Sequence, residues 1–209
     1  IIEEPFYMGV YPVTQSNWLA VTGERPSCFS RHHEGRDKVE NILDWQLDRF
    51  PVERVSLDDI IQRFLDLLNR NYREKNLIYR LPTDEEWEYA CRGGGTSSEL
   101  YRVNNPYAYH FYLRRPSNDI TTEQANFAGE LGRTSEVGQY KANALGIHDM
   151  HGNVWEWTTS YDRSRKPIMR GGSWGSKEDR CLASVRDTGE RGKQYNTVGF
   201  RLVAVPDES

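Results

Sequence analysis

The heptapeptide HGNVWEW at residues 151–157 places one carboxylate between two indoles, directly after a Gly-Asn turn signal. In a β-strand, alternation puts Trp155 and Trp157 on one face and Glu156 on the other. The two indoles are therefore predicted to face the core. Glu156 must then meet water, a basic side chain or a metal ion, and the rest of the sequence has to decide among these.

The cysteines are the other side chains with chemical potential. Cys28, Cys91 and Cys181 are an odd and widely spaced set, which is not typical of a disulfide framework and contains no CxxC pair. We expect three free thiols, which would suit a cytoplasmic protein. The sequence contains no GxGxxG or GxxxxGK[ST] phosphate loop and no GxSxG nucleophile elbow.

Three helices are predicted from their capping residues. Thr14 begins a helix that ends before Gly23, and Ser56 begins a second one with an apolar stripe over residues 60–68. Thr83 and Glu86 form a capping box for a third. We expect the second and third to be the two main helices.

The remaining chain is predicted to form short strands and ordered loops. Strand-like stretches occur at residues 153–160, 167–174, 180–187 and 198–205, whereas residues 96–140 are rich in Gly, Asn and Tyr and lack periodicity. Because nothing resembles a linker, we predict one irregular α+β domain over residues 1–209.

The bulk properties exclude some classes of function. The 209 residues carry a formal net charge of −4, so no strong basic field exists to hold nucleic acid. No apolar run approaches the roughly 18 residues of a membrane span. The first residues do not resemble a signal peptide, and the cellular location stays open apart from the indication given by the cysteines.

Several motifs in order along the chain carry a family resemblance. They are PFYMGVYPVTQSNW, GERPSCF, PVERVS, YRLPTDEEWEYACRGG, NALGIHDMHGNVWEW, RGGSW and GFRLV. Together they resemble the formylglycine-generating enzyme family, also called the sulfatase-modifying-factor domain. The resemblance implies a compact, irregular relative of the C-type lectin fold.

The resemblance also implies a specific oxidative chemistry. Active members oxidise a sulfatase cysteine with copper held by two thiolates, spaced CxxxxC after the RGGS motif. Here the second position is Cys181 but the first is Ser176, and a serine hydroxyl is a poor ligand for Cu(I). We therefore do not expect copper. Cys181 would be catalytic only if the chain is an enzyme; otherwise we expect it on a strand, packed with Ala183 and Val185.

The resemblance offers one explanation for the carboxylate of HGNVWEW. In the family, the corresponding asparagine and glutamate can bind calcium, which favours hard oxygen ligands. Asn153 and Glu156 are therefore predicted as possible calcium ligands. The alternative is an ion pair between Glu156 and an arginine such as Arg170 or Arg201, and the sequence does not choose between them.

Residues 174–198 form a mostly polar stretch between the RGGSW and GFRLV motifs, as expected of a binding surface for a protein or other macromolecule. Some relatives are variable proteins of diversity-generating retroelements, in which this stretch is rewritten. We predict a non-catalytic ligand-binding protein; the alternatives are a copper-dependent formylglycine-forming oxidase and a sensor or regulatory module. The predicted ligand-binding residues are Trp174, Ser176, Asp179, Arg180, Asp187, Tyr195 and Asn196.

Overall fold

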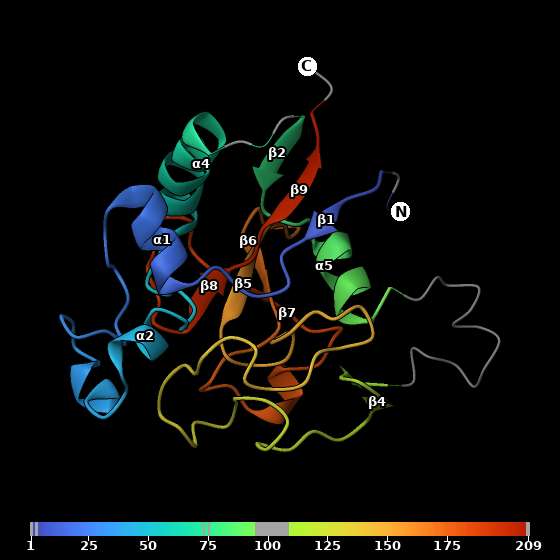
Figure 1. Cartoon of the computed structure of the whole chain (residues 1–209). Helices are drawn as coiled ribbons and strands as arrows, with labels where there is room; N and C mark the ends of the chain where they lie inside the picture. The colour runs from blue at the N-terminus through green and yellow to red at the C-terminus, as the bar shows by residue number, and fades with distance from the viewer. Residues whose placement is uncertain (1, 3, 73, 75, 95–108, 208–209) are drawn as a thin grey trace.

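The computed structural model describes residues 2, 4–72, 74, 76–94 and 109–207 (Figure 1). Residues 96–108 of the stretch predicted to be irregular lie outside this description. The elements in chain order are β1 (Tyr7–Met8), α1 (Gln15–Thr22), η1 (Arg36–Val39), α2 (Asp44–Leu47), α3 (Leu57–Asp59), η2 (Ile60–Leu65), α4 (Asp66–Asn71), β2 (Leu77–Arg80), α5 (Asp84–Cys91), β3 (Phe111–Tyr112), β4 (Pro116–Ser117), β5 (Trp155–Tyr161), β6 (Pro167–Arg170), η4 (Glu178–Arg180), β7 (Arg186–Thr188), β8 (Val198–Phe200) and β9 (Val203–Pro206).

The three predicted helices are confirmed, with the caps that the sequence indicates. The Thr14 side chain accepts a hydrogen bond from the Asn17 amide, and Gly23 ends α1 in the left-handed conformation. Ser56 caps a helical run in which α3, the π-helical segment η2 and α4 follow one another without a gap. The Thr83 capping box precedes α5.

Three small sheets organise the strands. Their orders are β1-β9-β2, β3-β4 and β7-β6-β5-β8, and β5 pairs with β8 in parallel but with β6 antiparallel. Trp157 lies opposite Met169 on one side and Phe200 on the other. Strand β5 contains the last three residues of the HGNVWEW motif, and its two neighbouring strands hold these residues in place.

The alternation predicted for β5 is confirmed. Trp155 and Trp157 are buried in the largest apolar cluster, together with Trp18, Phe64 and Phe200. Glu156 is also fully buried, but it lies against α5 rather than in that cluster.

One predicted strand is largely wrong. Residues 180–187 form the end of η4, a turn and only the beginning of β7. Cys181 consequently lies after a 3-10 turn, in a cluster with Phe111, Ala125 and Phe127, and not on a strand beside Ala183 and Val185. The polar Lys-Glu-Asp-Arg run at 177–180 favours this turn over a strand because its side chains are exposed.

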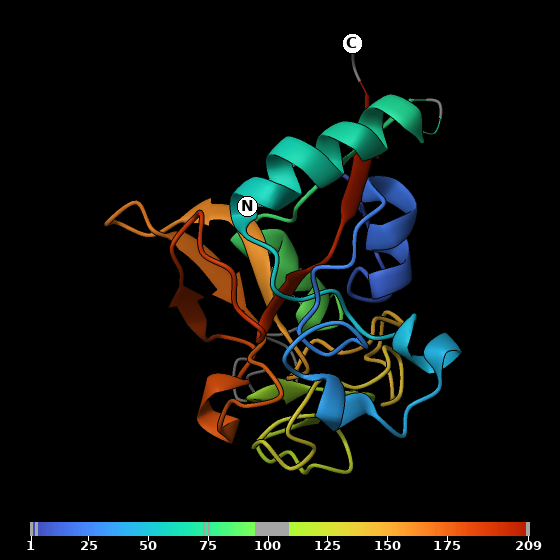
Figure 2. The same ribbon diagram turned by 90° about the vertical axis from the view of Figure 1, so that its left-hand side faces the viewer.

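The elements separate into two ends. Figures 1 and 2 show α1, α4 and the β1-β9-β2 sheet at one end, with the four-stranded sheet in the middle. The other end consists largely of loops from residues 109–150 and of the segment around η4. None of the helices in the described residues is long and apolar enough to cross a membrane.

Candidate functional site

The polar segment 174–198 is fixed at its start, shortly after the end of β6 at Arg170. The amide of Trp174 donates to the carbonyl of Asn153 at 2.8 Å, and its own carbonyl accepts from Gly129 at 2.7 Å. The carbonyl of Ser176 accepts from Ala128 at 2.8 Å. These backbone bonds hold the start of the segment against the loop at residues 126–129, so its exposed part begins from a rigid position.

Gly172 allows the tight turn before this segment. Its φ angle of +77° lies in the left-handed region, and a Cβ atom there would lie only 2.4 Å from the sulfur of Cys181. The motif RGGSW therefore needs glycine at this position both for backbone conformation and for the close approach of Cys181.

The structure brings together two predicted ligand-binding residues from opposite ends of the segment. The Nε1 atom of Trp174 donates to the carbonyl of Asn196 at 3.1 Å. The ring of Phe29 meets the Trp174 indole edge-on, with centroids 5.4 Å apart. Trp174 is half-buried and Asn196 is exposed, so both residues keep some surface in contact with solvent.

A second pair forms around η4. The Arg180 guanidinium lies 2.5 Å from the Asp187 carboxylate, and both side chains are well exposed, at 45% and 38%. The same guanidinium lies 5.6 Å from the centroid of the Trp155 ring. These contacts hold Arg180 in a defined position on the surface, and the neighbouring Asp179 is exposed as well.

The other predicted residues have more structural roles. The Tyr195 hydroxyl accepts from the Glu190 amide at 3.3 Å, and its ring lies 6.4 Å from that of Trp157. The Ser176 hydroxyl lies 3.1 Å from that of Ser173. Among the described residues, no hydrogen bond or ion pair joins the Trp174–Asn196 pair to the Arg180–Asp187 pair.

The cysteines do not fit a two-thiolate copper site. The thiol of Cys181 is fully buried, and desolvation raises its pKa to about 12 although a backbone hydrogen bond with Ser173 lowers it. At the position of the first thiolate, the Ser176 hydroxyl accepts from the Ser173 amide at 3.0 Å. Cys91 is buried in a different cluster, and burial raises its pKa to about 12 as well.

Glu156 is held in an ion pair, which was one of the two sequence-based interpretations. Its two oxygens accept from Nε and one terminal nitrogen of Arg201 at 2.9 and 2.8 Å. The indole of Trp87 donates a third bond at 2.7 Å. Both oxygens of the Glu156 carboxylate are therefore engaged by groups of the protein.

Asn153, the other predicted calcium ligand, is also engaged. Its φ angle is +64°, and its side-chain oxygen accepts from the Ser135 amide at 3.0 Å and from Asn126 at 3.3 Å. Its amide nitrogen donates to the Ser135 carbonyl at 3.2 Å. A calcium ion at these two residues stays an untested prediction. No group of three or more His, Cys, Asp or Glu side chains within the described ranges is placed to hold a metal.

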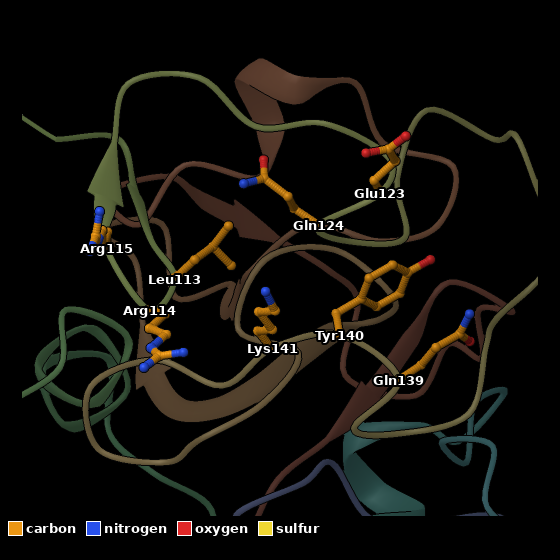
Figure 3. Close-up of a pocket in the computed structure, with 8 residues that line it drawn as sticks. All are labelled: Leu113, Arg114, Arg115, Glu123, Gln124, Gln139, Tyr140 and Lys141. Atoms are coloured by element: carbon orange, nitrogen blue, oxygen red, sulfur yellow. The ribbon is translucent and has the colours of Figure 1, made fainter.

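The structure contains a pocket that the sequence did not predict. Residues 113–115, 123–124 and 139–141 line a pocket of about 640 Å³ (Figure 3). Three separate loop segments build it, so no continuous motif marks it. The adjacent Arg114 and Arg115 were the available signal, but an exposed basic pair alone is too common to indicate a pocket.

The comparisons with known proteins agree with the fold. The family model for the sulfatase-modifying factor enzyme 1-like domain matches residues 1–205. The chain therefore belongs to this family of formylglycine-generating-enzyme-like domains.

Individual relatives match smaller parts of the chain. The chaperone protein LppX of Paenibacillus barcinonensis is 31% identical over 201 residues, covering 82% of this chain and 70% of LppX. The formylglycine-generating enzyme of Mycobacterium tuberculosis is 44% identical over 149 residues, covering 71% of this chain but only 45% of the enzyme. The structure of Treponema denticola variable protein 1 superposes with a TM-score of 0.71 and 23% identity over 96% of this chain and 84% of that one, which shows the shared fold.

Proposed function

We propose that this domain is a non-catalytic ligand-binding protein that contacts a protein or other macromolecule through residues 174–198. The observation that carries the proposal is that Ser176 stands at the first copper position while the thiol of Cys181 is fully buried. A hydroxyl replaces the first copper thiolate, and the second thiol is fully buried with a raised pKa. A protonated thiol is a poor nucleophile, and one sulfur alone does not form the two-thiolate site that suits Cu(I).

The surface itself supports binding. Residues 177–180 and 190–194 are exposed, while Trp174 and Arg180 are held by bonds and ring contacts to the scaffold. Tryptophan and arginine dominate the energetics of many protein interfaces. Side chains that are already ordered lose less entropy on association. The segment therefore combines an anchored base with an exposed polar surface, which supports a role in binding.

The names of two relatives bear on the alternative function, that of an enzyme. LppX is named as a chaperone, and the mycobacterial relative as a formylglycine-generating enzyme. The 44% identity to the latter makes a copper-dependent oxidase the second candidate. Turnover of a sulfatase-type CxPxR peptide, supplied with Cu(I) and oxygen, distinguishes them by mass spectrometry. We expect no conversion; conversion that Cys181→Ala abolishes would refute the binding-protein proposal.

A photo-crosslinking experiment identifies the partner. A photoreactive amino acid placed at Asp179 is compared with one placed at Arg163, an exposed residue in the turn between β5 and β6. A protein captured at position 179 but not at 163 is then purified. We expect Trp174→Ala and Arg180→Ala to weaken its binding by about tenfold or more, and Arg163→Ala to leave it unchanged. Equal affinity for all three variants would place the interface elsewhere.

Diversification of the segment is a separate part of the proposal. The fold shared with Treponema denticola variable protein 1 supports it only at the level of the scaffold. The test is the neighbouring DNA: a near-repeat of the codons for residues 174–201, differing at adenines and followed by a reverse-transcriptase frame, is expected. Without such a repeat, the segment is a fixed binding surface.

A further inference from the structure

We propose that the pocket formed by residues 113–115, 123–124 and 139–141, the anion pocket, binds a small phosphate-bearing anion. Its volume of about 640 Å³ lies within the range of roughly 300–1,000 Å³ that is typical of small-molecule sites. None of its lining residues belongs to segment 174–198, so this site is distinct from the proposed macromolecular surface.

The charge of the anion pocket is opposite to that of the chain. Arg114, Arg115 and Lys141 contribute three positive charges against the single carboxylate of Glu123, whereas the chain as a whole carries −4. In Figure 3 the ammonium of Lys141 lies between Leu113 and Tyr140, and both arginines are drawn on the side away from Glu123. Three cations and one carboxylate give the lining of the pocket a positive balance.

No salt bridge between described residues neutralises these three cations. Salt bridges bind most arginines of the domain, including Arg170, Arg186 and Arg201. Within the described ranges, by contrast, no carboxylate forms an ion pair with Arg114, Arg115 or Lys141. All three side chains are exposed, so an anion that enters the pocket can pair with cations that no described carboxylate already occupies.

Neutral donors complete the site. Gln124 has its side-chain oxygen fixed by the Thr121 amide at 3.0 Å, which leaves its NH₂ group for a ligand. The Tyr140 hydroxyl is protonated at neutral pH and can donate, and burial, together with the nearby Asp149 and Glu130 charges, raises its pKa further. Guanidinium and ammonium groups with such donors match the oxygens of a phosphate group.

The loops that present these donors are anchored from behind. The Tyr140 carbonyl lies 2.7 Å from Nδ1 of His148. The Gly138 amide donates to the Asp149 carboxylate at 2.7 Å, and the Gln124 amide donates to the Thr121 carbonyl at 2.9 Å. The pocket wall is thus held in place before a ligand arrives, which lowers the entropy lost on binding.

Calorimetric titration with inorganic phosphate and pyrophosphate, at low ionic strength, tests the proposal. We expect pyrophosphate to bind more tightly than phosphate, because it offers more oxygens and more charge to three cations. The double variant Arg114→Gln/Lys141→Gln should weaken pyrophosphate binding by about tenfold or more, since it removes two charge-assisted contacts. Arg163→Gln, which removes an exposed arginine outside the pocket, is the matched control and should bind as the wild type does.

A gain-of-binding variant protects the test against misfolding. Glu123→Gln removes the only carboxylate that lines the pocket in the described residues, so we expect pyrophosphate to bind about two- to threefold more tightly. Backbone amide signals of Gln124 and Lys141 should shift in NMR spectra during the titration. The proposal is wrong if Arg163→Gln weakens binding as much as the double variant does, if Glu123→Gln has no effect, or if malonate binds as tightly as pyrophosphate.

Discussion

Glu156 and Arg201 form a two-point ion pair in the interior, with nitrogen–oxygen distances of 2.9 and 2.8 Å and neither residue exposed to solvent. Arg201 extends this contact by donating to the carbonyls of Gly9 and His148, both at 2.8 Å. One buried guanidinium therefore ties strand β5 to the beginning of the chain and to the loop before HGNVWEW.

Breaking this pair should strongly destabilise the fold. Glu156→Gln leaves the Arg201 charge buried without its counter-ion, and we expect a loss of about 3–5 kcal/mol in the free energy of unfolding, measured in urea. The matched control is Asp48→Asn, which breaks an exposed pair with Arg25 at 3.4 Å. That change should cost at most about 1 kcal/mol. Similar losses in the two variants would contradict the role assigned to the buried pair.

Glu53 should make stability depend on pH. Burial raises its pKa from 4.5 to about 8, although it accepts hydrogen bonds from the amides of Cys28 and Phe29. The folded state therefore holds a proton that the unfolded state has released. Its contribution is complete below pH 4.5 and is lost as the pH rises towards about 8, by at most ~1.4 kcal/mol per pH unit.

The measurement is a series of urea unfolding curves between pH 5 and pH 9. In Glu53→Gln, which cannot ionise, the fall in stability over this window should be clearly shallower than in the wild type. Asp149, whose pKa burial raises to about 6, contributes in the same direction at lower pH and is unchanged in both proteins. Parallel curves for wild type and variant would show that Glu53 is not the titrating group.

Restoring the missing thiol should create a copper site. Ser176 and Cys181 both contact Ser173, so Ser176→Cys places a second sulfur near the first. We expect this variant to bind one Cu(I) in competition with a chromophoric chelator, because two thiolates suit this soft ion. Ser164→Cys adds a thiol at an exposed turn instead and should not gain the site. Equal copper uptake by the two variants would mean that position 176 has no special relation to Cys181.

A comparison of alanine substitutions at Gly172 and Gly129 separates the cost of backbone strain from the cost of a steric clash. Both have positive φ angles, +77° and +74°, but only at Gly172 would a Cβ atom meet another atom within 4 Å. Gly129→Ala should therefore cost about 1–2 kcal/mol of stability. Gly172→Ala should cost clearly more, because the new carbon would lie 2.4 Å from the Cys181 sulfur. Thermal unfolding of both variants measures the difference; equal costs would mean that Cys181 moves aside freely.

Local signals in the sequence determined the helices and the two faces of β5. Thr14, Ser56 and Thr83 act on amides three residues away, and alternation assigns Trp157 to the core without reference to distant residues. The sequence also determined that a serine stands where an active relative would have its first copper thiolate, which is the basis of the proposed function.

Tertiary structure alone decided the partner of Glu156 and the position of Cys181. Arg170 and Arg201 were equally plausible partners, because both follow strand-like patterns; only the parallel pairing of β5 with β8 and the packing of α5 direct Arg201 to Glu156 and Arg170 to Asp84. The anion pocket likewise joins three loops that are distant in sequence. Contacts of this kind depend on how loops close in space, and no local pattern of residues encodes that closure.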